Sequence, residues 1–254
     1  MNTMQEVLAY KSPEILADTP THFCPGCHHG IVHKLLAACL EEKELAEKSI
    51  CVAAIGCGAF IYNYVLVDSL EAPHGRAPAV ATGVKRSSPD SFVFVYQGDG
   101  DLASIGLAEI MHAANRGERI TVVYVNNTVY GMTGGQMAPT TMVGQKTTTT
   151  PGGRQPELDG FPLQMAEIMS RLRGVHFAAR VAVNNIKNLK KAKKALLRAF
   201  EVQKLGMGFG FVEFLASCPT NWRMTPVEAN ERVAGEMIPY FPLGVLKDAV
   251  AEEG

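Results

Sequence analysis

The sequence lacks three features that would point to particular kinds of partner. Its 24 Lys and Arg residues nearly balance 25 Asp and Glu residues, so the net charge of −1 gives no electrostatic reason to expect nucleic acid or an anionic membrane surface. The longest strongly apolar run, residues 50–61, is too short to span a bilayer. Residues 1–16 lack a basic region followed by an apolar one, so we expect no secretory signal. These absences predict a cytoplasmic protein without a membrane span.

Alternating strand and helix patterns predict the fold class. With 254 residues the chain is long enough for one well-cored domain, and two are not required. Short β-branched and aromatic runs predict strands at residues 51–55, 92–96, 120–125, 175–183 and 210–215. Helical spacing of apolar residues predicts helices at 31–47, 102–116 and 186–204. We therefore expect a single α/β domain over residues 1–254, with a mostly parallel sheet flanked by helices.

A long segment without periodicity, residues 131–162, interrupts this alternation. It is rich in Gly, Thr and Pro. Unstructured loops of this length are uncommon in compact domains and usually form lids, interfaces or disordered segments. We expect an active-site or interface loop, with plain disorder as the alternative.

Two short polar strings follow neighbouring predicted strands. Gly98-Asp99-Gly100-Asp101 follows one strand and Asn126-Asn127 follows the next, which places Asp99 and Asn127 28 positions apart. Open α/β sheets bind ligands at the carboxyl ends of their strands. Mg²⁺ prefers oxygen ligands and usually shares them with a phosphate. The two strings therefore predict a site for a metal-bound diphosphate.

The glycines of the first string support this prediction. Gly98 and Gly100 allow the backbone to turn sharply and to approach a phosphate without an intervening Cβ atom. The helix expected after them points its positive end at the same place. A lone Gly-Asp-Gly is a weak signal, because such turns also occur as plain connections. Its pairing with the two asparagines makes it strong.

The chain contains six cysteines, which in the absence of a signal peptide argue for thiolate chemistry and against disulfides. Cys24 and Cys27 form a Cys-Pro-Gly-Cys motif, and Cys57 and Cys218 follow predicted strands. Such a set can bind a structural Zn²⁺ or a [4Fe–4S] cluster, and spacing alone favours zinc. A core role for all four is also open. Cys39 and Cys51 fall inside a predicted helix and strand and are expected to be core residues.

The paired strings resemble those of thiamine diphosphate enzymes. In that superfamily the Asp, the second Asn and a carbonyl two residues later coordinate Mg²⁺, which implies Asp99, Asn127 and Val129 here. The resemblance also implies a cofactor site made of Gly56, Cys57, Gly58, His74, Gly98, Asp99, Gly100, Asp101, Asn127, Val129, Tyr130, Gly131, Met132 and Thr133.

A narrower resemblance covers almost the whole chain. The motifs CPGC, IGCG, HGRA, GDGD, NNxxYGMTGGQ and CPTNW resemble the β subunit of 2-oxoacid:ferredoxin oxidoreductases. This implies that Cys24, Cys27, Cys57 and Cys218 hold a [4Fe–4S] cluster near the thiamine. It also places His74 and Arg76 at the active site, where they could bind a substrate carboxylate or the cofactor phosphates; a surface loop is the alternative. His28 and His29 depart from the family pattern, and either a hydrogen bond to cluster sulfur or helix capping would explain them.

The resemblance implies an enzyme that is active only with partner subunits. The reaction is the coenzyme A-dependent oxidative decarboxylation of a 2-oxo acid, with electrons passing through the cluster to ferredoxin. The glutamate that activates thiamine belongs to a separate pyrimidine-binding domain, for which this chain has no room. We therefore expect an α subunit carrying that domain and its Glu, together with a γ portion and a ferredoxin-like δ subunit.

Several alternatives stay open at this point. A non-oxidative thiamine diphosphate lyase would share the diphosphate strings but has no use for four clustered cysteines. A zinc-stapled scaffold would explain the cysteines alone. The apolar and aromatic residues 58–64 favour a branched-chain substrate such as 2-oxoisovalerate, with pyruvate and 2-oxoglutarate as alternatives.

One charged feature has no place in this scheme. Lysines recur on one side of the predicted helix 186–204, at Lys187, Lys190, Lys191, Lys193 and Lys194. They could dock an acidic protein, but a solvated helix face is the favoured interpretation.

Overall fold

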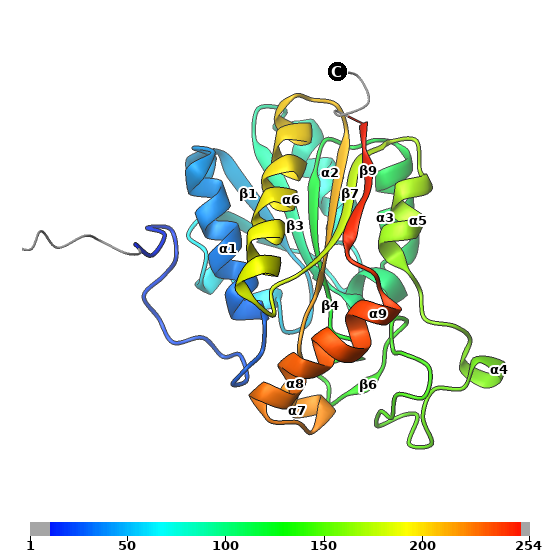
Figure 1. Cartoon of the computed structure of the whole chain (residues 1–254). Coiled ribbons are helices and arrows are strands. Elements are labelled where there is room, and N and C mark those ends of the chain that lie inside the picture. Colours follow the sequence, from blue (N-terminus) through cyan, green and yellow to red (C-terminus); the bar gives the residue numbers. More distant parts are fainter. Residues whose placement is uncertain (1–10, 250–254) are drawn as a thin grey trace, which may run out of the picture.

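The computed structural model describes residues 11–249 and shows the expected α/β architecture (Figure 1). Seven strands form one sheet in the order β2-β1-β3-β4-β8-β7-β9. All neighbouring strands are parallel except β9, which runs antiparallel to β7 at the edge. The prediction of a mostly parallel sheet flanked by helices is confirmed. The outermost parts of the predicted domain, residues 1–10 and 250–254, lie outside the described residues, as does most of the segment inspected for a leader.

The strands are mostly the continuous apolar runs seen in the sequence. The sheet contains β1 (Ser49–Ala53), β2 (Asp68–Glu71), β3 (Phe92–Gly98), β4 (Thr121–Asn126), β7 (Val175–Ala182), β8 (Phe209–Leu215) and β9 (Gly244–Asp248). A separate antiparallel pair consists of β5 (Val129–Tyr130) and β6 (Gln136–Met137). The central strands are buried on both faces, as parallel strands between two helix layers must be.

Helices cover both faces of the sheet. The helices are α1 (His29–Glu42), α2 (Ala77–Ser87), α3 (Leu107–Asn115), α4 (Pro156–Asp159), α5 (Met165–Arg171), α6 (Ile186–Lys204), α7 (Pro219–Trp222), α8 (Pro226–Arg232) and α9 (Ile238–Tyr240). Short 3-10 helices span η1 (Ala46–Lys48) and η2 (Ala59–Asn63), and π-helices span η3 (Asp101–Ile105) and η4 (Val233–Met237). Helices α1 and α6 pack on one face, and α2, α3 and α5 pack on the other.

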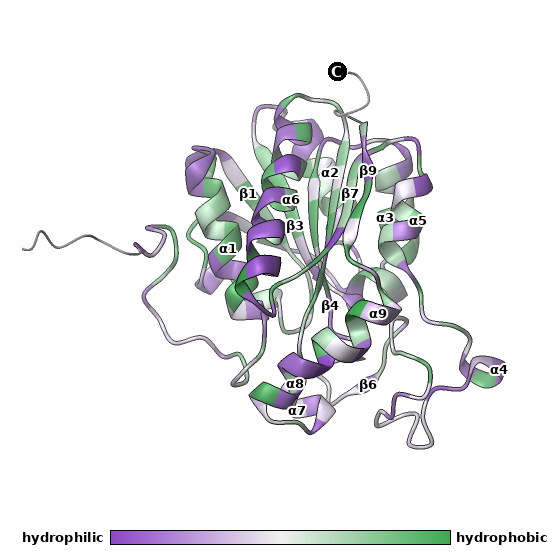
Figure 2. Cartoon of the chain, viewed as in Figure 1, coloured by the Kyte–Doolittle hydropathy of each residue, from purple (hydrophilic) through white to green (hydrophobic). Residues whose placement is uncertain are grey.

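The two faces have separate apolar cores, and alternate residues of β3 belong to each. Phe92, Phe94 and Tyr96 point to the α1 and α6 side, whereas Val93 and Val95 point to the other. Cys39 and Cys51 are fully buried in the first core, as expected. Figure 2 shows the resulting pattern, with polar residues on the outward side of the helices. No helix within residues 11–249 is both long and apolar enough to cross a membrane.

Some predicted element boundaries were wrong. The helix predicted at 31–47 ends at Glu42, because Glu44 takes a left-handed conformation with φ of 54°. The helix predicted at 102–116 is divided at Gly106 into a π-helix and α3. The predicted strand 92–96 continues to Gly98, and the elements β2, β9, α2 and α5 were not predicted.

The order of the strands defines where a ligand would bind. Strand β1 is followed in sequence by β2 on one side of it, whereas β3, β4 and β8 extend the sheet on the other side. The crevice at the carboxyl ends of β1 and β3 is therefore the switch point at which open α/β sheets bind ligands.

Candidate active site

A cavity of about 110 Å³ lies at this switch point, where β1, β3 and β4 end. Sixteen residues line it: His29, Ile55, Gly56, Cys57, Gly58, His74, Gly98, Asp99, Gly100, Asp101, Asn127, Val129, Tyr130, Gly131, Met132 and Thr133. Fourteen of them are the residues predicted for the cofactor site. His29 and Ile55 are additional, and of the residues 58–64 considered for a substrate pocket only Gly58 contributes.

Asp99 offers a carboxylate at the floor of the cavity. Its side chain is 2% exposed, and its two oxygens accept hydrogen bonds from the Gly100 N–H at 2.9 Å and the Thr140 hydroxyl at 2.5 Å. Burial raises the pKa of Asp99 to about 7, and these hydrogen bonds only partly oppose that effect. A bound divalent cation would favour the ionised form, because an opposite charge nearby lowers the pKa of a carboxyl group. Thr140, which the sequence analysis missed, belongs to the 131–162 loop and reaches Asp99 from there.

The two asparagines of the second string have different roles. Asn127 lines the cavity, and its side-chain oxygen accepts the Val129 N–H at 3.2 Å across a turn in which Thr128 has φ of 64°. Trp222 donates to the Asn127 carbonyl at 3.2 Å and fixes that turn. Asn126 instead points into the sheet and donates to Glu213 at 2.8 Å. Only the second asparagine is therefore available to a ligand.

Asp101 organises the His-Gly-Arg element at the cavity rim. Its carboxylate accepts the Gly75 N–H at 2.9 Å and the Gln97 amide at 2.5 Å, and it also pairs with the His74 ring. Gly75 has φ of 80°, and a Cβ atom there would lie 2.6 Å from the Gly106 nitrogen. No other residue fits this contact between the turn and η3 without a shift of backbone.

The structure separates the two residues proposed for catalysis. His74 lines the cavity and is about one-third exposed. Arg76 does not line it, and its guanidinium pairs with Glu109 of α3. The HGR element is therefore a rigid turn in which the histidine faces the cavity and the arginine ties the turn to a neighbouring helix.

Four cysteines approach one another beside the cavity. Cys24 is exposed, Cys27 and Cys57 are partly buried, and Cys218 is buried; all are free thiols. A Cβ atom on Gly131 would lie 3.3 Å from the Cys57 sulfur and 3.6 Å from the Cys218 sulfur. Burial raises the pKa of Cys27 to about 12, and the proximity of the other three cysteines adds to that effect. The Cys57 and Cys218 sulfurs therefore lie close to the Gly131 backbone, and both Gly131 and Cys57 line the cavity.

The four thiols do not converge on a single point. A Zn²⁺ site needs its sulfurs about 2.3 Å from one centre. Within the part of the chain that the structure describes, no three His, Cys, Asp or Glu side chains converge in a way that would hold one metal ion. A [4Fe–4S] cluster takes four thiolates around a larger core. Asn221, which was not predicted, donates to the Cys218 sulfur at 3.3 Å and to the Gly131 carbonyl at 2.9 Å.

The CPGC loop is locked in place by the C-terminal helices. A Cβ atom on Gly26 would come within 2.5 Å of Pro226 in α8, so the contact requires glycine. Ser217 donates its hydroxyl to the Gly26 carbonyl at 2.6 Å and its N–H to His28 at 3.3 Å. His28 makes no side-chain capping bond to α1, so the capping prediction was wrong for this residue.

His29 connects the cysteine region to the core. Its ring lies 2.7 Å from the Tyr96 hydroxyl, and burial lowers its pKa to about 4, which leaves the imidazole neutral. Within the described residues, neither the His28 nor the His29 side chain hydrogen-bonds to a cysteine sulfur; their partners include Ser217 and Tyr96.

The loop 131–162 is an ordered structure built around one guanidinium. Arg154 is 4% exposed and donates to six backbone carbonyls, those of Ala138, Pro139, Thr141, Asp159, Gly160 and Phe161. Strand β6 and helix α4 belong to the same segment, and β6 pairs with β5 just before it. These contacts do not fit the alternative of plain disorder, and they hold Thr140 against Asp99.

The fold and this site define a thiamine pyrophosphate-binding domain. Residues 50–207 match the family described as "Thiamine pyrophosphate enzyme, C-terminal TPP binding domain". The matched range contains β1, β3 and β4 with both polar strings.

Comparison with known proteins narrows the class. The chain is 48% identical over 236 residues to the ketoisovalerate oxidoreductase subunit VorA of Methanothermobacter marburgensis, covering 93% of this chain and 49% of that protein. It is 34% identical to the 2-oxoglutarate synthase subunit KorB of Archaeoglobus fulgidus, covering 92% of this chain and 87% of that one. A solved structure of 2-oxoglutarate:ferredoxin oxidoreductase from Magnetococcus marinus, with 2-oxoglutarate, coenzyme A and succinyl-CoA bound, superposes with a TM-score of 0.74 at 26% identity, covering 95% and 86% of the two chains.

The chain therefore belongs to the 2-oxoacid:ferredoxin oxidoreductase family. It spans about half the length of the ketoisovalerate oxidoreductase subunits that it matches.

Proposed function

We propose that this chain is the thiamine diphosphate-binding subunit of a coenzyme A-dependent 2-oxoacid:ferredoxin oxidoreductase that acts on a branched-chain 2-oxo acid. The single observation that carries the proposal is the position of Gly131. It lines the cavity, and a Cβ atom at this position would lie 3.3 Å from the Cys57 sulfur and 3.6 Å from the Cys218 sulfur. A diphosphate cradle and a thiol cluster thus share one wall, and only oxidative thiamine chemistry needs both.

The cavity residues fit the pyrophosphate end of the cofactor and Mg²⁺. Asp99, the Asn127 side-chain oxygen and the Val129 carbonyl would hold the cation, because carboxylate and carbonyl oxygens are its preferred ligands. The unsubstituted Gly98 and Gly100 leave the backbone open to phosphate oxygens, and Tyr130 to Thr133 continue along the same wall. Asp101 would hold His74 toward the bound diphosphate.

The four cysteines would hold the cluster. Bound thiamine diphosphate would supply a nucleophilic carbon and an electron sink, and a [4Fe–4S] cluster would accept electrons one at a time. Cys24, Cys27, Cys57 and Cys218 would be the ligands. Asn221 would donate a hydrogen bond to the Cys218 sulfur, a contact of the kind that tunes cluster potentials.

The cavity is incomplete for catalysis by this chain alone. Among the described residues that line it there is no glutamate, the group that activates thiamine in this superfamily. We propose that a partner subunit supplies that residue with the pyrimidine-binding domain, and that a γ portion and a ferredoxin-like δ subunit complete the complex. The isolated chain is therefore expected to bind Mg²⁺ and diphosphate but not to oxidise a 2-oxo acid.

The substrate class rests on the relatives. Proteins named for ketoisovalerate are 48% identical to this chain, whereas those named for 2-oxoglutarate are 34–38% identical. We propose 2-oxoisovalerate or a similar branched-chain acid as substrate, coenzyme A as the acyl acceptor and ferredoxin as the electron acceptor.

The test is a steady-state assay of the assembled complex with coenzyme A, a low-potential dye and each of three substrates. We expect the highest kcat/KM with 2-oxoisovalerate, and lower values with pyruvate and 2-oxoglutarate. A clear preference for 2-oxoglutarate would overturn the substrate assignment. Release of CO₂ without dye reduction would instead indicate a non-oxidative lyase.

The cluster has an independent test. We expect anaerobically purified protein to be brown and to contain iron, and Cys57→Ser to lose the visible absorption. Zinc without iron would contradict the cluster and favour a structural metal site.

A further inference from the structure

The outward side of α6 is hydrophilic (Figure 2), and its charged residues there are mostly lysines. We define the basic face as Lys187, Lys190, Lys191 and Lys194, which are exposed and recur at the three- and four-residue steps that align side chains on one side of a helix. Lys193, on the same helix, is balanced by Glu42 at 2.5 Å. Within residues 11–249 the four members of the basic face have no acidic partner.

The charge is concentrated at the end of the helix where it is least favourable. Cations stabilise the carboxyl end of a helix and oppose the positive dipole at its amino end. Helix α6 has no acidic residue in its first turn, although Lys187 is its second residue. In its second half, Arg198 is paired with Glu201 and Asp248. Lys187 therefore opposes the helix dipole with no acidic residue in the same turn to balance it.

A groove with an apolar floor adjoins the basic face. It has a volume of about 240 Å³ and lies between α1 and α6. Ile31, Leu35, Ala38 and Leu189 form its floor, and Lys34, Lys190 and Lys193 surround it. An apolar centre with a charged rim is the usual anatomy of a protein interface.

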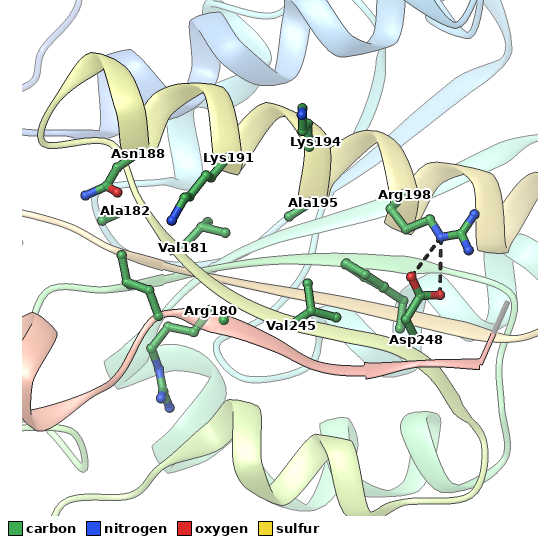
Figure 3. A pocket seen from close by; sticks show the side chains of 13 residues that line it. Arg180, Val181, Ala182, Asn188, Lys191, Lys194, Ala195, Arg198, Val245 and Asp248 are labelled. Carbon is green, nitrogen blue, oxygen red and sulfur yellow. Dashed lines mark hydrogen bonds and ion pairs between the residues drawn. The ribbon is translucent and has the colours of Figure 1, made fainter. Parts of the chain in front are cut away.

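The other side of α6 extends this surface. A pocket of about 360 Å³ lies between α6, β7 and β9, and Lys191 and Lys194 of α6 are among the residues that line it (Figure 3). Arg198 and Asp248 close its far end with an ion pair at 3.0 Å. The lysines near the start of α6 therefore lie between the groove on the α1 side and the pocket on the β7 and β9 side.

A chain of contacts places the start of α6 beside the cysteine cluster. Asn184, two residues before the helix, accepts a hydrogen bond from Asn230 of α8 at 3.1 Å. Helix α8 in turn packs through Pro226 against Gly26 of the CPGC loop. Cys24 in that loop is the exposed member of the four cysteines. The basic face and the solvent side of the thiols thus share the carboxyl end of the sheet.

We propose that the basic face is the docking site of a separate, acidic ferredoxin that takes electrons from the cluster. This proposal rests on the proposed function, because it assigns a surface to that reaction. A 2-oxo acid and coenzyme A give an acyl-CoA, CO₂ and a proton; the bond to the carboxylate breaks, a carbon–sulfur bond forms, and the two electrons released reduce two ferredoxins by one each. Redox encounters use small interfaces steered by charge, and the four lysines of the basic face, which adjoins an apolar groove, suit such an encounter.

The test compares two acceptors in the assembled complex. In Lys187→Glu/Lys190→Glu we expect the KM for an acidic ferredoxin to rise at least ~10-fold at low ionic strength, because charge steering changes association rates by 10–10³-fold. The ferredoxin Kd, measured by biolayer interferometry on the resting complex, is expected to rise in parallel. The difference from wild type should shrink as salt screens the charges. Activity with methyl viologen, a small dye that needs no docking surface, should be unchanged.

A matched control uses the other end of the same sheet. Lys48→Glu/Lys204→Glu makes the same change in net charge, with Lys204 on the last turn of α6, and should leave both acceptors unaffected. Equal ferredoxin KM and Kd in wild type and the Lys187/Lys190 variant would overturn the proposal and leave a solvated face. Loss of a subunit from that variant on gel filtration would also overturn it, because the face would then be a permanent interface. Absence of dye-linked activity in the wild-type complex would instead refute the proposed function.

Discussion

Asp99, which follows β3, and Glu213, within β8, are both fully buried carboxylates. They differ in whether a cation of the chain lies beside them. Burial raises the pKa of both. Glu213 is compensated by Arg180, whose Nε lies 3.0 Å away, and by the Asn126 amide. Asp99 receives hydrogen bonds from a hydroxyl and a backbone N–H but has no cation partner in the described part of the chain. A buried charge whose partner is in the chain is structural, whereas one whose partner is missing indicates a ligand.

The structural member of this comparison predicts the largest effect. Arg180→Met would leave Glu213 buried without its cation, at a cost of about 3–5 kcal/mol in the free energy of unfolding. Denaturant titration would measure it. Arg198→Met is the control, because its ion pairs with Glu201 and Asp248 are partly exposed and are worth no more than ~1 kcal/mol. Equal destabilisation by the two substitutions would remove the distinction.

For Asp99 we expect a loss of activity and no loss of stability. We expect Asp99→Asn to lower the activity of the assembled complex about 10²-fold, by analogy with the loss of a preorganised charge in other active sites. Its stability without metal should not fall, since an uncompensated buried carboxylate is removed. Calorimetric titration with Mg²⁺ and thiamine diphosphate would test the binding defect, with the exposed Asp90→Asn as control. Wild-type metal affinity in the variant would contradict the assignment.

Thr140 sharpens the comparison from the loop side. Thr140→Val keeps the shape of the side chain but removes the hydroxyl that donates to Asp99. Partners that orient a metal ligand typically contribute 10–100-fold to metal affinity. We therefore expect the Mg²⁺ dissociation constant to rise about 10-fold. Thr141→Val, which removes a hydroxyl bonded to the Thr128 carbonyl instead, separates this effect from a general loosening of the loop. A larger loss of Mg²⁺ affinity in Thr141→Val than in Thr140→Val would show that the hydroxyl of Thr140 is not what orients Asp99.

His33 is a buried polar side chain at which we expect no ligand. Both ring nitrogens are buried and have no hydrogen-bond partner within residues 11–249. Burial, with smaller contributions from His29 and His22, lowers the pKa of His33 well below 6.5. The unfolded chain binds this proton more readily, so the associated stability is present above pH 6.5 and is lost as the pH falls. We expect His33→Leu to be more stable by about 1 kcal/mol and less sensitive to acid. Thermal melts at pH 7.5 and 5.5 would check this, and greater acid sensitivity in the variant would contradict it.

The central strands and both polar strings could be predicted because their signals are local. Parallel strands buried on both faces are continuous apolar runs, and Asp99 and Asn127 directly follow two of them. Strand β2 was missed because its sequence, Asp-Ser-Leu-Glu, is that of an exposed edge. The break near Gly106 was missed because it depends on the contact with Gly75, 31 residues earlier.

The residues missed at the site act through distant contacts. Thr140 reaches Asp99 across 41 positions, and Trp222 reaches Asn127 across 95. In the described part of the chain the hydrogen bonds of Arg154 all go to backbone carbonyls. Every residue has a backbone carbonyl, so the sequence does not indicate which of them Arg154 binds. The choice of Asn127 over Asn126 came from the resemblance to thiamine diphosphate enzymes, and in the structure Asn127 lines the cavity whereas Asn126 donates to Glu213.

The six carbonyls gathered by Arg154 have a consequence for how this domain can change over time. A guanidinium that binds main-chain oxygens holds the loop by its backbone, so its shape does not depend on which side chains decorate the outside. Leu158 and Phe161, at 81% and 73% exposure, lie on that free surface. The loop can therefore exchange its outer residues while Thr140 stays against Asp99. A single buried arginine makes the outer surface of the loop and its contact with Asp99 separately adjustable.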